Sequence, residues 1–199
     1  MTGTHYSDTI LGRVFSQSST PLGLAAGVYT GTATGLQMPI FNPPGSNRNV
    51  ELISLDINYV SGAAANGDIG IMGLPLTAVA TGQLCTALTQ STPVNQCLGS
   101  GNQSKIISGN ASAPITVTAG VATLPTSLAP GWIRSVYSFN QELSASATPV
   151  PGTMTTYQFN GSMILAPGYM IYLAASQASV ALFGYTWVWK ELPIVAAQG

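Results

Sequence analysis

The sequence predicts an all-β protein: a single antiparallel β-sandwich, jelly-roll-like, with an extended N-terminal arm. Short apolar runs alternate with polar residues along much of the 199-residue chain. Turn signals rich in Gly and Pro recur roughly every 8 to 15 residues. No helical period lasts longer than about two turns, so we expect little helix. Some eight or more short strands in one domain favour a sandwich, and a jelly roll holds that number without a barrel channel.

The chain divides into an arm over residues 1–45, which includes an edge strand, and a sandwich domain over residues 46–199. The first segment is rich in Gly, Thr, Ser and Pro, and its apolar pieces, such as "TILGRVF", are short. A terminus of this composition is ordered chiefly when packing ties it down. We therefore expect the arm to contact a partner.

The clearest strand signal follows the turn "NPPGSN". Side chains there alternate with the two-residue period of a strand, which separates them onto two faces. The set expected to face inward is Ile53, Leu55, Ile57 and Tyr59. The set expected to face outward is Leu52, Ser54, Asp56 and Asn58.

The middle of the chain predicts shorter elements. "IGIMGLPLTAVATGQL" is a broken strand in which Pro75 indicates an edge or a bulge. The stretch from Cys85 to Asn110 is mostly loop, with a short strand near "SKIIS". "ITVTAGVATL" indicates a hairpin about Ala119-Gly120, and "GWIRSVYSFNQEL" a further strand.

The last third predicts three more strands. The first covers Tyr157 to Leu165, with room for an Asn160-Gly161 turn inside it. The second covers Tyr169 to Ala174, after the Pro167-Gly168 turn. The last strand lies in "SVALFGYTWVWKEL" and closes the domain.

The closing strand carries four aromatic residues on one face. They are Phe183, Tyr185, Trp187 and Trp189. Because each ring buries on the order of 150–250 Å², something must cover this face. Two interpretations remain open: the rings form the thick end of the sandwich core, or Tyr185, Trp187 and Trp189 lie at a subunit interface, where Tyr and Trp are enriched.

The chain carries very little charge. Only 6% of its residues are charged and the net charge is −1, whereas an ordinary soluble protein has roughly a quarter charged. A surface of hydroxyl and amide groups is cheaper to desolvate against a partner than one of unpaired ions. This favours a protein that packs among neighbours, the alternative being an environmentally exposed β protein that is simply neutral.

The same composition argues against several partners. No basic patch is present that could neutralise several phosphates, so we expect no direct nucleic-acid binding. No window approaches the roughly 18 apolar residues of a membrane span, and the first residues lack the features of a secretion signal. We therefore expect a chain that is made and kept in the cytosol until something other than secretion releases it.

We expect neither catalysis nor a cofactor. His5 is the only histidine, and the six carboxylates are scattered singly along the chain. Cys85 and Cys97 flank a polar loop that offers no further metal ligands, so we expect no metal site there. These two cysteines form either a loop-closing disulfide in an oxidising medium or two free thiols.

Three pieces of the chain resemble small β-sandwich virion proteins of tailed bacteriophages, of the capsid decoration or cement type. They are "FNPPGSNRNVELISLDINYVSG", "LAPGYMIYLAASQ" and "ALFGYTWVWKELP", together about a quarter of the chain. The resemblance implies a non-enzymatic jelly-roll-like subunit, often trimeric, bound to the major capsid protein on the outside of an icosahedral shell. It also implies a virion protein assembled in the host cytoplasm. No region matches the long helix or extended loop of the common tailed-phage shell protein.

Three functions therefore compete. The first is a structural protein that decorates or cements a capsid, as a homotrimer by the resemblance. The second is a receptor- or glycan-binding head or tail fibre module, although the loop from Cys85 to Asn110 contains no aromatic residue for such contacts. The third is a jelly-roll major capsid protein that tiles a shell by itself.

Overall fold

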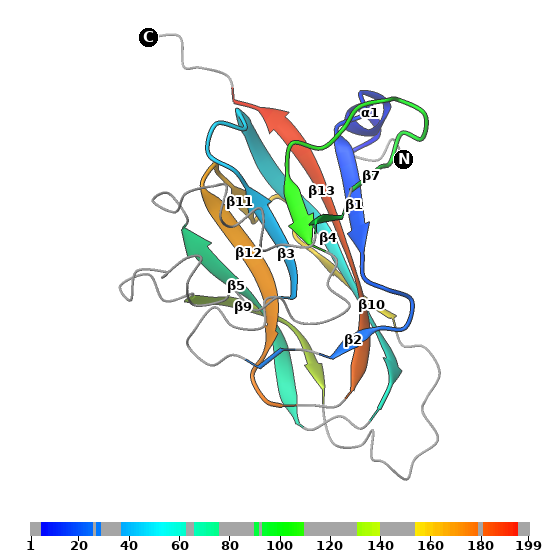
Figure 1. Cartoon of the computed structure of the whole chain (residues 1–199), viewed down its shortest axis with the longest axis vertical. Helices are drawn as coiled ribbons and strands as arrows, with labels where there is room; N and C mark the ends of the chain where they lie inside the picture. The colour runs from blue at the N-terminus through cyan, green and yellow to red at the C-terminus, as the bar shows by residue number, and fades with distance from the viewer. Residues whose placement is uncertain are drawn as a thin grey trace.

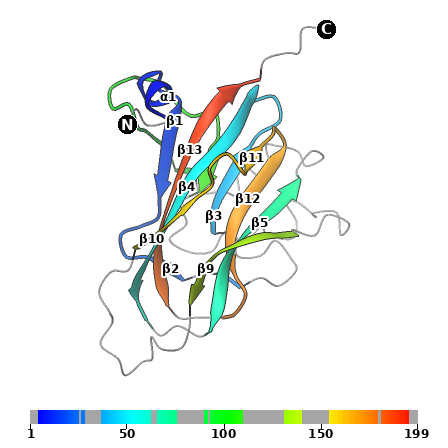
Figure 2. The same cartoon turned by 180° about the vertical axis from the view of Figure 1, so that it is seen from behind.

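The computed structural model describes residues 5–25, 27–28, 37–62, 66–75, 90–91, 93–109, 131–139, 154–178 and 181–194. Nearly all of the described elements are β-strands, and one five-residue helix, α1 (Tyr6–Ile10), precedes the first of them. The strands form two antiparallel sheets that pack face to face, which confirms the predicted all-β sandwich (Figures 1 and 2).

One sheet, here called sheet A, has the order β10-β4-β13-β1-β7. Its members are β10 (Met154–Gln158), β4 (Arg48–Ser61), β13 (Leu182–Pro193), β1 (Val14–Ser18) and β7 (Val94–Asn95), with β11 (Ile164–Leu165) beside β4 and β2 (Leu24–Ala25) beside β13. The other, sheet B, has the order β6-β8-β3-β12-β5-β9. Its members are β6 (Gln90–Ser91), β8 (Ile107–Gly109), β3 (Gln37–Asn42), β12 (Tyr169–Ala175), β5 (Gly67–Pro75) and β9 (Gly131–Phe139).

The pairing of the longer strands is that of a jelly roll. The described strands of five or more residues are, in chain order, β1, β3, β4, β5, β9, β10, β12 and β13. They pair from the ends inward: β1 with β13, β3 with β12, β4 with β10, and β5 with β9. This nesting describes one long antiparallel ribbon rolled so that alternate pairs fall into opposite sheets. The jelly-roll-like topology expected from the number of strands is therefore present.

The core lies between the two sheets. Sheet A contributes the aromatic face of β13 and the buried residues of β4, and sheet B contributes mainly aliphatic residues. Those from sheet B include Met38, Ile40, Ile69, Ile71, Ile171 and Leu173. Rings on one side and branched aliphatic chains on the other let the two layers interdigitate, which is the main source of stability in a sandwich.

The β4 strand corrects one predicted face. Trp189 pairs with Leu52 and Val188 with Ser54, so Ile53 is an extra residue, a β-bulge, in the ladder with β13. A bulge reverses the alternation on one side of it. Leu55 and Ile57 are buried as predicted and Tyr59 packs against the core, but Leu52 is buried in place of Ile53, which is only half-buried.

The bulge leads to a testable difference between two neighbouring residues. Leu55→Ala should lower the free energy of unfolding by about 2–5 kcal/mol, because it opens a cavity in the core. Ile53→Ala should cost about 1 kcal/mol or less, because its side chain keeps part of its exposure. Urea denaturation of both variants measures the two values. Equal losses would place Ile53 in the core and contradict the bulge.

The described part of the N-terminal segment contributes strands to both sheets. Strand β1 lies between β13 and β7 in sheet A, and β3 lies between β8 and β12 in sheet B. All six residues of β3 are buried. The described part of residues 1–45 is thus integral to both layers, because strands distant in sequence supply the backbone partners that its own composition does not reveal.

Most other predicted strands are found. Pro75 is the last residue of β5 and still pairs with β12. The described pairing of β5 with β9 stops at Gly73, so no backbone N–H is needed from Pro75 on the β9 side. The Tyr157–Leu165 segment is split at Asn160-Gly161 into β10 and β11, which both pair with β4. The hairpin predicted about Ala119-Gly120 lies outside the described residues.

Candidate functional site

The aromatic face of β13 is the centre of the core. Phe183, Tyr185, Trp187 and Trp189 are each at most 1% exposed. Trp189 stacks on Phe15 of β1 with ring centroids 6.3 Å apart, and Trp187 stacks on Phe159 at 6.1 Å. Burial also raises the pKa of the Tyr185 hydroxyl well above its usual range.

This burial corrects the interface interpretation of Tyr185, Trp187 and Trp189. A side chain that its own chain covers completely has no surface to offer to a second subunit. The interpretation of these rings as the thick end of the core is the one that the structure supports. The alternating pattern predicted that the aromatic face of β13 is covered, but it did not show whether the other sheet or a second subunit covers it.

A second site is an apolar groove where the free edges of the two sheets meet. It lies between β9 of sheet B and the segment around β11 of sheet A, and has a volume of about 480 Å³. Exposed side chains of Ile133, Ile164 and Tyr169 line it. Scattered exposed apolar residues are ordinary, but three around one groove form a surface suited to a partner.

Arg134 ties the two sheet edges together at this groove. Its Nη1 atom donates hydrogen bonds to the Tyr157 hydroxyl at 3.2 Å and to Ser162 Oγ at 3.0 Å, and its guanidinium lies 5.9 Å from the centre of the Tyr157 ring. Arg134 is on β9 and Tyr157 on β10. The groove therefore has a wall that is fixed by polar contacts between the sheets.

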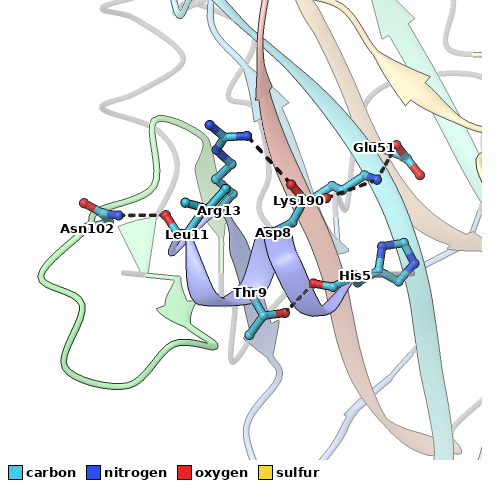
Figure 3. A network of polar contacts seen from close by, with 8 residues as sticks. All are labelled: His5, Asp8, Thr9, Leu11, Arg13, Glu51, Asn102 and Lys190. Carbon is cyan, nitrogen blue, oxygen red and sulfur yellow. Dashed lines mark hydrogen bonds and ion pairs between the residues drawn. The ribbon is translucent and has the colours of Figure 1, made fainter. Parts of the chain in front are cut away.

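A charged cluster fastens α1 to the outer side of sheet A. Lys190 Nζ lies 3.0 Å from Glu51 Oε2 and 3.6 Å from Asp8 Oδ2, and the three side chains are largely buried (Figure 3). Glu51 and Lys190 face each other across the β4–β13 ladder, whereas Asp8 comes from α1. A lysine between two carboxylates offsets the repulsion that they would otherwise exert on each other.

A polar pocket of about 460 Å³ lies near this end of the sandwich. Its lining includes Arg13, Arg48 and Lys105, together with the buried carboxylate of Glu191. Glu191 follows the aromatic residues of β13 on the same inward-facing side, while Lys190 points to the opposite side, as strand alternation requires. The pocket is thus built where the apolar core ends.

The loop before β8 is held in this pocket by Glu191. Ser104 Oγ donates to Glu191 Oε1 at 2.5 Å, and the backbone N–H of Lys105 donates to Oε2 at 3.1 Å. The Trp189 indole N–H also points to Oε1, at 3.4 Å. Both carboxylate oxygens therefore accept hydrogen bonds inside the protein.

Gly12 also lines this polar pocket. Its φ of +64° favours glycine, and a Cβ there would lie 2.5 Å from Asn102 Nδ2. Asn102 Nδ2 donates to the Leu11 carbonyl at 3.2 Å (Figure 3). Asn95 Nδ2 donates to the Gly12 carbonyl at 2.9 Å. The turn after α1 and the loop after β7 are thereby joined.

Only one of the two cysteines, Cys97, lies among the described residues. Cys97 is half-buried in the loop after β7, where its N–H donates to Asn95 Oδ1 at 2.8 Å. Cys85 lies outside the described residues, so both a disulfide and two free thiols stay as predictions. His5 is the residue that precedes α1.

Sequence reasoning missed both charged groupings. Arg13, Arg48 and Lys105 are 35 or more positions apart, and so are Asp8, Glu51 and Lys190, so no local pattern links either set. Only the nested strand pairing brings them to one end of the sandwich. Among the described residues, no group of three or more metal-ligating side chains occurs, and no helix has the length and apolar character needed to span a bilayer.

Comparison with known proteins adds no relative: no family model matches the chain, and neither the curated proteins nor the solved structures give a significant match.

Proposed function

We propose that this chain is a non-enzymatic virion structural protein that decorates or cements the outside of an icosahedral capsid as a homotrimer. The observation that carries the proposal is the jelly-roll pairing of its eight longer strands, a topology used widely for viral capsid domains. A fold alone does not assign a function. The surface supplies the second argument.

The surface suits permanent contact with other proteins. With 6% charged residues, copies repel one another weakly, and hydroxyl and amide groups can be buried against a partner at low cost. The groove lined by Ile133, Ile164 and Tyr169 adds the apolar area that subunit contacts bury. These features support a second copy of the chain as one partner and the major capsid protein of the same virus as the other.

The trimer is tested by sedimentation of the purified chain. We expect a particle of three times the 20.4 kDa of one chain, and little change in its mass between low and high salt, because the contacts are apolar and uncharged. Ile164→Glu should release monomers by placing a charge in the groove. Leu98→Glu, at an exposed site in the loop after β7, is the matched control and should leave the trimer intact.

Capsid binding is tested by adding the chain to stripped capsids at low and high salt. We expect binding to persist as the salt concentration rises, since screening acts on exposed ion pairs and not on apolar contacts. A wild-type chain that sediments as a monomer at every concentration would exclude the trimer. Loss of capsid binding at moderate salt would show that the few charges govern the contact.

A further inference from the structure

Three of the five cationic side chains in the chain line one pocket. Lysine and arginine together number only five, and Arg13, Arg48 and Lys105 all contribute to the pocket of about 460 Å³ between the turn after α1, the start of β4 and the loop before β8. In a chain with so few charges, this is the largest gathering of one sign in the described structure. Like charges brought together raise the free energy unless an anion accompanies them.

The anions of the protein do not neutralise this pocket. Among the described lining residues Glu191 is the only acidic one. It is 4% exposed, and its oxygens accept hydrogen bonds from Ser104, the Lys105 N–H and Trp189. Asp8 lies 3.8 Å from Arg13 but is shared with Lys190. In the described part of the chain, the side chains of Arg48 and Lys105 have neither a hydrogen bond nor an ion pair.

The backbone positions that carry the cations are fixed within the protein. Arg48 begins β4 and pairs through its backbone with Pro193, and Glu191 fixes the backbone of Lys105. Asn102, whose amide donates to Leu11, fixes the wall beside Arg13 (Figure 3). The side chains of Arg48 and Lys105 thus extend from fixed backbone and remain available to an anionic ligand.

We infer that this pocket binds the carboxylate group of a small organic ligand, a role separate from the proposed capsid contact. The planar guanidinium groups of Arg13 and Arg48 match a carboxylate in two-pronged geometry. The negative charge of Glu191 disfavours a doubly charged phosphate more than a singly charged carboxylate. Exposed carboxamides of Asn102 and Gln103 can bind hydroxyl groups that flank the carboxylate.

The test is a calorimetric titration of the full chain with four probes. Glucuronate and butyrate each carry one carboxylate, on a sugar and on a plain carbon chain, glucose is the neutral match of glucuronate, and inorganic phosphate is the other oxyanion. We expect binding of a carboxylate in the millimolar range, which suits a ligand of this size, and none of glucose. Binding of glucuronate alone assigns the site to sugar acids, and binding of both assigns it to the carboxylate group itself.

Two substitutions locate the site. Arg48→Gln should weaken carboxylate binding about tenfold or more by removing a charge-assisted contact. Arg134→Gln removes one positive charge from the apolar groove between β9 and the β11 region, and should leave the carboxylate affinity unchanged. Circular dichroism checks that both variants are folded. The inference is wrong if no carboxylate binds, if phosphate binds as tightly as the better carboxylate, or if Arg48→Gln and Arg134→Gln have equal effects.

Discussion

Trp187→Ala is expected to lower the free energy of unfolding by about 3–5 kcal/mol, because it removes the largest kind of side chain from the centre of the core. The Trp187 indole N–H also donates to the Met38 carbonyl at 3.0 Å. Met38 has a φ of +48° beside Pro39, where the register of β3 with β12 shifts. Trp187 therefore supports both the packing of sheet A and an irregular turn of backbone in sheet B.

Trp187→Phe separates these two contributions. Phenylalanine keeps most of the ring but leaves the Met38 carbonyl buried without this donor, which should cost about 1–3 kcal/mol. Urea denaturation followed by circular dichroism measures both variants, and unchanged m-values would allow the two midpoints to be compared directly. If Trp187→Ala unfolds at the wild-type urea concentration, Trp187 is not in the core and the sandwich register is wrong.

Lys190→Met is expected to cost about 3 kcal/mol, because it leaves Asp8 and Glu51 largely buried without the cation between them. Methionine preserves the length and much of the packing of lysine, so the loss reports on charge. We also expect α1 to loosen from sheet A, which would appear as faster amide hydrogen exchange over Tyr6–Ile10 than in the wild-type chain.

A background without the carboxylates is the control. In the Asp8→Asn, Glu51→Gln double variant, adding Lys190→Met should cost much less, because no repulsion is released. Unfolding curves of the wild type, Lys190→Met, the double variant and the triple variant complete a thermodynamic cycle. An equal cost of Lys190→Met in both backgrounds would mean that the loss does not come from the contacts of Lys190 with Asp8 and Glu51.

The strength of a local pattern determined how much of the fold could be predicted from the sequence. The aromatic face of β13 alternates without interruption, and that strand and its covered face were predictable. In β4 the apolar residues on both sides of Ile53 fit either of two registers, and only pairing with β13 decides where the bulge lies. The place of β3 in sheet B likewise depends on its partners β8 and β12, which come from far along the chain.

The candidate sites could not be predicted, because each is assembled by long-range pairing. The apolar groove joins β9 to the β11 region, and the cation-lined pocket joins Arg13, Arg48 and Lys105. Each of these residues is unremarkable among its sequence neighbours. The four aromatic residues of β13, which stand out in the sequence, are instead fully buried in the core and belong to neither site.

Electron microscopy of virus particles purified with and without this chain is the most direct test of the proposed function. We predict that particles lacking the chain keep a closed icosahedral shell and lose trimeric density from its outer surface, and that adding the purified chain restores this density. Shells that fail to form without the chain would make it a shell-building subunit. Particles that are identical with and without the chain would contradict a structural role in the virion.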